Sequence, residues 1–465
     1  MRQVDTQLSS LNWGAICAVL FSCAAWFLFA RGFSVGFTGW IWFGALSLGM
    51  AVLATIGFLR VSPFQSLFLF FSPTALCLLI FTFYFYLVLS VNNDATEFCV
   101  TYIACTSALT MIFVVSLWPL IKAVRYRSIR RYRVSAGARL LIGTSLLGWT
   151  LLVLAGILGG IGSLLDIYRD PLRMRTFMSG GGMAYYKIVC DFLVLMPPNI
   201  AALRRYSEGK PSRVFPLLVL SGILYTLASG SRGTTIGLLL SLIMIRQFLG
   251  KPLKPILFVA FGVAIVPFVA ILGEYRSNPL LYGEGIGSIL KIGSALGPEN
   301  ILKLFVARLD ASYYFNLLTQ QRSSTPLLYG VSYLAWPLQV IPRFLWPGKP
   351  LLPNTELTYR LVTDSANNVT FDFSIFGESY LNFGVMGVLF SALVIFVFIA
   401  YLQRRYEKMV ESRDVSEVLF FILMWGMSMY VVVSGVVAMA TATSLVLVQY
   451  WVARMLFLQK VGSNG

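Results

Sequence analysis

The chain has 465 residues, of which 58% are hydrophobic and 12% are charged, and its formal net charge is +17. Since a soluble globular chain has about 25% charged residues, this composition excludes an ordinary soluble domain. In a membrane protein the excess of 36 basic over 19 acidic residues is an orientation signal and not a nucleic-acid footprint. The chain has no histidine, which excludes an imidazole base, and its remaining Cys, Asp and Glu residues show no metal-ligand spacing.

Apolar segments of about 20 residues recur along the chain and match the thickness of a bilayer core. They predict an all-α polytopic membrane protein with about twelve transmembrane helices. Three parts follow: residues 1–273 with nine spans, a large polar loop at 274–376, and residues 377–465 with three spans. The predicted spans are 11–30, 38–59, 65–90, 99–121, 140–164, 183–203, 214–229, 234–250, 255–273, 377–402, 416–434 and 437–458.

Basic residues gather in alternate loops, which predicts the orientation of the chain. The loop from Lys122 to Arg139 carries basic but no acidic residues, and three later loops of the same phase hold further Lys and Arg. These loops and both termini are therefore predicted to be cytoplasmic. The large loop then faces the other side, which in a bacterium is the periplasm.

The turn Ser229–Thr235 is a candidate anion site on the periplasmic face. Its Ser and Gly residues free backbone N–H groups at the start of a helix, and Arg232 adds a bidentate phosphate donor. An ordinary N-cap turn, with the arginine reaching the lipid headgroups, explains the same residues.

The large loop holds three further arginines that suit an anionic substrate. Arg276 follows a span, and Arg308 and Asp310 precede an aromatic run. Arg343 lies in a Trp-Pro-rich stretch that we interpret as a lid half-embedded in the outer leaflet. A helix-end ion pair, a solvated interfacial helix and lipid anchoring are the respective alternatives.

Carboxylates near the end of this loop are the candidates for a general base, since histidine is absent. Glu378 lies at the mouth of a span and shares a helix face with Asn382, and Asp372 and Asp310 are the other candidates. The one mid-span acid that we identify, Asp191, is four residues from Lys187, which predicts an internal ion pair.

These landmarks, taken in order, resemble the oligosaccharide repeat-unit polymerases, the Wzy or O-antigen polymerase family. The likeness covers roughly residues 185–400 and depends on an ordered set of short motifs. The motifs are Gly230-Ser231-Arg232-Gly233, Arg276, Arg308-Leu309-Asp310, the segment from Ile341 to Pro350 that ends in Trp346-Pro347-Gly348-Lys349-Pro350, and Phe376-Gly377-Glu378 through Phe383-Gly384.

The resemblance implies an inner-membrane fold similar to the class C glycosyltransferases. It implies a metal-independent transfer of glycan between units carried on undecaprenyl pyrophosphate, without a cofactor, and a chain-length regulator of the co-polymerase type as partner. On this basis Arg232, Arg276, Arg308 and Arg343 are expected to bind pyrophosphate. Glu378, ahead of Asp310, is expected to deprotonate the acceptor hydroxyl.

Other functional classes stay open at this point. A lipid-oligosaccharide flippase fits the span count, but it should place ionisable residues along a path through the bilayer. An O-antigen ligase shares the topology, but its pattern uses a histidine in the large loop. A non-catalytic assembly protein is the third alternative.

Overall fold

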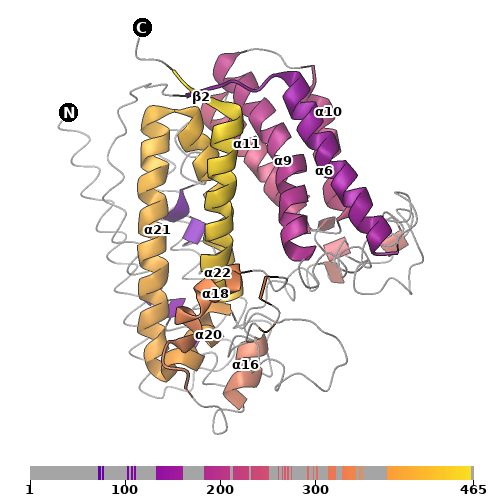
Figure 1. The fold of residues 1–465 in the computed structure, drawn as a ribbon. Helices are drawn as coiled ribbons and strands as arrows, with labels where there is room; N and C mark the ends of the chain where they lie inside the picture. The colour runs from indigo at the N-terminus through magenta and orange to yellow at the C-terminus, as the bar shows by residue number, and fades with distance from the viewer. Residues whose placement is uncertain are drawn as a thin grey trace, which may run out of the picture.

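The computed structural model describes the chain at residues 132–160, 183–209, 213–229, 232–250, 313–320, 327–341 and 374–461, and at single positions between 72 and 110, 260 and 301, and 345 and 348. This part of the chain is mostly helical and contains one two-stranded sheet (Figure 1). Its helices are α6 (Ala138–Leu158), α9 (Met183–Glu208), α10 (Phe215–Ala228), α11 (Arg232–Leu249), α16 (Tyr313–Gln320), α17 (Val331–Leu334), α18 (Trp336–Val340), α20 (Ser374–Phe383), the 3-10 turn η3 (Gly384–Met386), α21 (Gly387–Ser412) and α22 (Val415–Phe457). The strands are β1 (Tyr132–Val134) and β2 (Leu458–Lys460).

Four helical segments in the described ranges are long and apolar enough to cross a membrane, so the chain is a candidate multi-pass membrane protein. They are Ala138–Leu158, Tyr185–Glu208, Ser374–Ser412 and Gly435–Phe457, and three shorter apolar helices are Phe215–Ala228, Gly233–Leu249 and Val415–Met427. Together these segments coincide with the predicted spans from 140–164 to 234–250 and from 377–402 onward. The other predicted spans lie largely or wholly outside the described residues, so the total of twelve stays a prediction.

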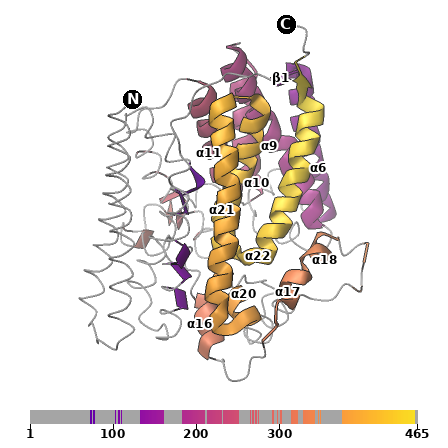
Figure 2. The same ribbon diagram turned by 90° about the vertical axis from the view of Figure 1, so that its left-hand side faces the viewer.

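The helices form two groups that lie side by side (Figures 1 and 2). In one group α9 packs against α6, α10 and α11, and in the other α20, α21 and α22 pack together. Contacts of α22 with α9 and α11 join the groups. The short loop helices α16, α17 and α18 lie at one end of this assembly, close to α20 (Figure 2).

The 43-residue element α22 is two antiparallel helices and not one rod. A straight helix would separate Ser416 and Tyr450 by about 50 Å at 1.5 Å per residue, yet their hydroxyl oxygens are 2.7 Å apart. The chain reverses at Gly435, whose φ of 84° and ψ of 179° are not helical. The predicted break between the segments 416–434 and 437–458 is therefore confirmed, and Gly435–Phe457 is long and apolar enough to cross a membrane.

The segment after the large loop differs from its prediction. The span predicted at 377–402 lies within the candidate membrane-crossing segment Ser374–Ser412, but this segment is divided, because α20 ends at Phe383 and α21 begins at Gly387. Gly384 has a φ of 58°, which breaks the first helix. Helix α21 then continues beyond residue 402 to Ser412, and in this extension the Arg405 guanidinium lies 4.8 Å from the Phe420 ring centre.

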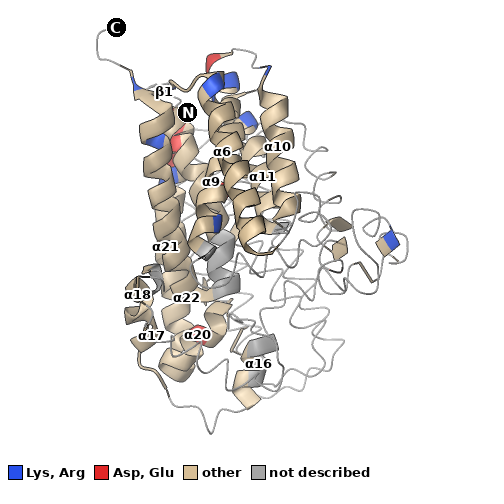
Figure 3. Ribbon diagram, turned by 45° about the vertical axis from the view of Figure 1, so that its right-hand side comes forward, with Lys and Arg blue, Asp and Glu red and all other residues tan. Residues whose placement is uncertain are grey.

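The predicted cytoplasmic loops converge at one end of the helices. Strand β1, from the basic loop that precedes α6, pairs antiparallel with β2, which follows α22. Arg204 near the end of α9 donates to the Ala136 carbonyl at 3.0 Å, and Arg205 lies over the Phe215 ring at the start of α10. Most of the described Lys and Arg residues gather at this end (Figure 3). We refer to it as the basic end.

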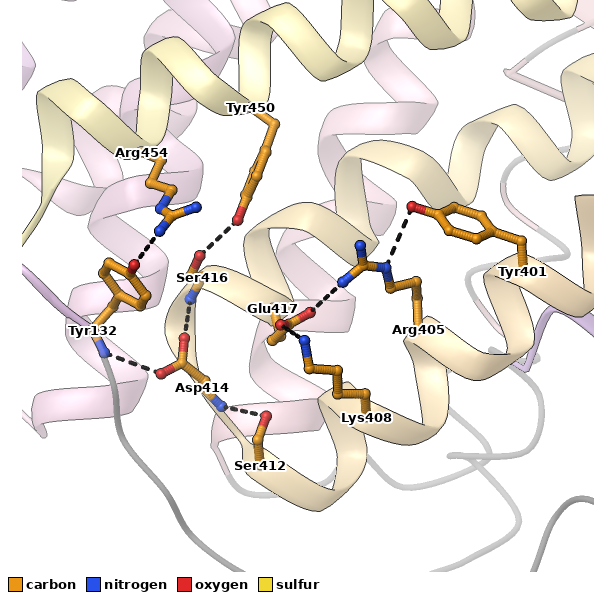
Figure 4. Close-up of polar contacts among 10 residues, drawn as sticks. All are labelled: Tyr132, Tyr401, Arg405, Lys408, Ser412, Asp414, Ser416, Glu417, Tyr450 and Arg454. Carbon is orange, nitrogen blue, oxygen red and sulfur yellow. Dashed lines mark hydrogen bonds and ion pairs between the residues drawn. The ribbon is translucent and has the colours of Figure 1, made fainter. Parts of the chain in front are cut away.

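Polar contacts stabilise the basic end (Figure 4). Asp414 caps α22: its Oδ1 accepts from Ser416 N at 2.9 Å and its Oδ2 accepts from Tyr132 N at 3.0 Å. Glu417 pairs with Lys408 at 2.5 Å and with Arg405 at 3.6 Å. Local capping and cross-element contacts thus fix the start of α22 against the sheet and α21.

Candidate functional site

The end opposite the basic end contains the start of α11, α20, the break in α22 and the loop helices α17 and α18. We refer to it as the far end. Of the predicted site residues, Glu378 lies here on α20, and Arg232 is the first residue of α11. The others, Arg276, Arg308, Asp310, Arg343 and the further candidate Asp372, lie outside the described residues. The predicted roles of all these residues stay predictions.

The side chain of Glu378 is buried, with 3% of its surface exposed. Its Oε2 accepts from the backbone N–H of Val436 at 2.5 Å and from that of Val437 at 3.3 Å. These donors belong to the first turn after the break at Gly435. The carboxylate therefore occupies the N-terminus of the half-helix Gly435–Phe457, where unpaired N–H groups and the helix dipole favour negative charge.

Gly435 makes this arrangement possible in two ways. Its φ of 84° with ψ of 179° belongs to a region that is almost restricted to glycine. A Cβ at this position would also lie 2.5 Å from Glu378 Oε2 and 3.3 Å from the Ser374 carbonyl oxygen. Close approach of the carboxylate to the half-helix therefore requires the absence of a side chain at residue 435.

Asn382, one helical turn after Glu378, connects α20 to the large loop. Its Oδ1 accepts from Gly330 N at 3.0 Å, and its Nδ2 donates to Ser332 Oγ at 2.6 Å and to the Glu378 carbonyl at 2.8 Å. Asn382 and Ser332 are fully buried. The predicted shared face of Glu378 and Asn382 is thus used to bind two separate segments, the half-helix and the start of α17.

Tyr333 of α17 completes this polar cluster. Its hydroxyl lies 3.1 Å from Ser379 Oγ. Burial, and then the nearby Glu378 carboxylate, raise the pKa of the Tyr333 phenol well above its ordinary value, so the phenol is protonated at neutral pH. The ring stacks near Phe383 and Phe390, with centroids 5.8 and 5.0 Å away.

A second aromatic cluster includes Tyr380 of α20. The rings of Tyr102, Phe315 and Tyr380 contact one another, with centroid distances from 5.0 to 5.8 Å. Phe315 belongs to α16, so two separate parts of the large loop pack against α20. The far end is therefore a packed unit that combines the loop with the span that follows it.

The ion pair within α9 was predicted correctly. Lys187 Nζ lies 2.6 Å from Asp191 Oδ2 within α9. The Tyr225 hydroxyl of α10 donates to Asp191 Oδ1 at 2.8 Å, so each carboxylate oxygen has a partner. Through Asp191 and Tyr225 this group of residues connects α9 to α10.

Sequence reasoning missed Gly435 and Tyr333. A glycine between two apolar spans predicts a turn, but nothing local indicates that Glu378, 57 positions earlier, would fill the space it leaves. The short motif around Tyr333 precedes Trp336-Pro337 and was interpreted only as part of the lid.

The described groups at the far end offer oxygen and nitrogen atoms that accept or donate hydrogen bonds. Within the described residues no group of three or more Cys, Asp and Glu side chains could hold a metal ion. No family model, curated protein or solved structure matches the chain.

Proposed function

We propose that this protein is a polymerase that joins lipid-linked oligosaccharide repeat units at the periplasmic face of a bacterial inner membrane. One observation carries the proposal: parts of the large polar loop pack directly on α20 and α22 at the far end, around a buried carboxylate. A membrane scaffold does not need a polar loop folded against its spans in this way, whereas chemistry at a membrane face does. The ordered sequence motifs that resemble the repeat-unit polymerases lie in the same loop and spans.

The proposed reaction replaces the bond between a sugar and pyrophosphate by a glycosidic bond between two sugars. The hydroxyl oxygen of the acceptor unit attacks C1 of the growing glycan, the C1–O bond to undecaprenyl pyrophosphate breaks, and a carboxylate takes the hydroxyl proton. Negative charge develops on the leaving pyrophosphate, and fixed arginine donors stabilise it. We assign this role to Arg232, Arg276 and Arg308, with Arg343 as a fourth donor.

The proton acceptor is Glu378 or Asp310 in this proposal. A general base must reach the acceptor hydroxyl, directly or through one water. Glu378 is 3% exposed and its Oε2 accepts two backbone N–H bonds. That geometry favours Asp310 as the base.

A flippase is the main alternative, and the ion pair within α9 disfavours it. A transport path needs ionisable groups that the substrate can reach. Lys187 and Asp191 neutralise each other at 2.6 Å, and Tyr225 occupies the second carboxylate oxygen. The ligase alternative is disfavoured by the lack of any histidine in the chain.

The implied setting is the inner membrane, with the basic end in the cytoplasm and both termini on that side. The orientation is supported by the convergence of β1, α9 and α10 at the basic end. The expected partners are undecaprenyl-pyrophosphate-linked oligosaccharides, membrane lipids and a chain-length regulator of the co-polymerase type.

Gel electrophoresis of surface polysaccharide from a deletion strain of the native host tests the proposal. The expected result is collapse of a long ladder to a single repeat unit, with the ladder restored by the wild-type gene. Loss of all glycan, including the single unit, would instead indicate a flippase or a ligase. An unchanged ladder would contradict the proposal.

A further inference from the structure

Two successive turns of α20 are bonded to two different segments. Glu378 accepts from the first N–H groups of the half-helix Gly435–Phe457, and Asn382 accepts from Gly330 N before α17. Backbone donors in a membrane cannot rely on water and need a protein partner. The half-helix begins immediately after a non-helical residue, so its first donors have no carbonyl of their own helix to bond.

We propose that Glu378 is a positioning residue, whose carboxylate holds the half-helix of α22 against α20 and thereby sets the position of the large loop. Glu378 and Asn382 lie one turn apart on α20, and the Asn382 amide also donates to the Glu378 carbonyl at 2.8 Å. Helix α20 therefore connects the half-helix to the start of α17. Helix α18, which is also part of the loop, packs on α22, so the loop contacts both α20 and α22.

This inference rests on the proposed function only where it connects the position of the loop to the transfer reaction. The loop carries Arg276, Arg308, Arg343 and Asp310, so its placement against the spans decides where pyrophosphate and acceptor can meet. Glu378 then acts through the loop and takes no proton, which leaves Asp310 and Asp372 as the candidate bases.

The amide variant Glu378→Gln separates positioning from proton transfer. A glutamine carbonyl accepts the same two N–H bonds as the carboxylate, but the amide cannot take a proton from the acceptor. The alanine variant Glu378→Ala removes both abilities. Glu417→Gln serves as a matched control, since Glu417 is a carboxylate at the basic end that pairs with side chains and not with backbone.

Two readouts are made on the full-length protein. The first is the thermal unfolding temperature of each purified variant in detergent, which does not depend on the reaction. The second is glycan length in the deletion strain carrying each variant. We expect Glu378→Gln and Glu417→Gln to retain most of the stability and the long ladder, and Glu378→Ala to lose several degrees and the ladder.

Each other outcome overturns one specific statement. A Glu378→Gln variant as stable as wild type, but with no ladder, would make Glu378 a proton acceptor and not a positioning residue. Equal stability of the alanine variant and wild type would show that the carboxylate does not hold the half-helix. Failure of the wild-type gene to restore a ladder would contradict the polymerase proposal alone. The unfolding temperatures would still show whether the Glu378 carboxylate holds the half-helix against α20.

Discussion

Both halves of α22 begin with a carboxylate at their N-terminus, but the two carboxylates come from different places. At the basic end Asp414 immediately precedes the helix and bonds Ser416 N, two residues away, and its other oxygen accepts from Tyr132 N of β1. At the far end Glu378 bonds Val436 N, 58 residues away, across a chain reversal. The capping bond of Asp414 is local and forms with the helix itself. That of Glu378 forms only when α20 and the half-helix are already packed.

This difference separates stability from arrangement. Loss of a local cap weakens one helix end. Loss of either carboxylate also removes a link between two elements, since Asp414 joins α22 to β1. At the far end, however, the linked elements position the loop that we assign to the reaction. Substitutions at the far end should therefore lower the free energy of unfolding more than comparable substitutions at the basic end. Measured losses of stability provide a direct test of the comparison.

Gly435→Ala should have the largest effect on stability. Strain in a glycine-only backbone region costs roughly 1–3 kcal/mol, and the new Cβ would lie 2.5 Å from Glu378 Oε2. We expect the free energy of unfolding, measured by denaturant titration in mixed micelles, to fall by about 3 kcal/mol or more.

Gly426→Ala is the matched control, because Gly426 lies in the first half of α22 and a Cβ there meets no atom within 4 Å. Its free energy of unfolding should stay the same or rise, since alanine has the higher helix propensity. Similar losses in the two alanine variants would contradict the role given to Gly435.

Asn382→Ala should have the next largest effect. The change removes the partners of Gly330 N and Ser332 Oγ in a fully buried place. Leaving buried polar groups unpaired costs on the order of 1–3 kcal/mol, and we expect about 2 kcal/mol in the same titration.

Ser391→Ala is its control, because the Ser391 hydroxyl is also buried but bonds only carbonyls of its own helix, such as Gly387 O at 2.7 Å. This variant should lose much less stability. A loss in Ser391→Ala equal to that in Asn382→Ala would mean that the link to the large loop adds nothing.

Asp414→Ala should destabilise the protein by about 1 kcal/mol, the usual size of a lost N-cap. It removes the bonds to Ser416 N and Tyr132 N at the basic end. Thermal unfolding in detergent measures the loss, and glycan length should be unchanged in cells. Collapse of the ladder in this variant would contradict the separation between the two ends.

Lys408→Ala should have the smallest effect. The side chain is 50% exposed and pairs with Glu417 at 2.5 Å. Since exposed ion pairs contribute little, we expect a loss of no more than about 0.5 kcal/mol in the same unfolding measurement. A loss comparable to that of Asp414→Ala would indicate that the ion-pair network at this end is structural.

Local patterns were sufficient to predict much of the described fold. Hydropathy located the two apolar helices on either side of Gly435, because each predicted apolar run is about as long as a bilayer is thick. Spacing alone predicted the Lys187–Asp191 pair, since residues four apart meet on one helix face. Basic loops predicted the end at which β1, α9 and α10 converge.

The rest depended on contacts between distant segments. Sequence spacing placed Glu378 and Asn382 on one face of α20, but it could not say that one would bond the half-helix of α22 and the other the loop before α17. The division of the predicted span 377–402 at Gly384 was missed for a similar reason. Gly384 has a left-handed backbone, and a Cβ at Gly387 would lie too close to the Ser379 carbonyl oxygen, so both glycines serve a close turn between α20 and α21.

The most direct test of the central claim compares one arginine of the large loop with one arginine at the basic end, in the deletion strain. Arg308→Ala changes the large loop, and Arg246→Ala changes an exposed residue in the last turn of α11 at the basic end. Glycan length is measured on gels after immunoblotting shows equal amounts of both proteins in the membrane. The account predicts a single repeat unit with Arg308→Ala and a full ladder with Arg246→Ala. A full ladder with Arg308→Ala would contradict the assignment of the reaction to the large loop.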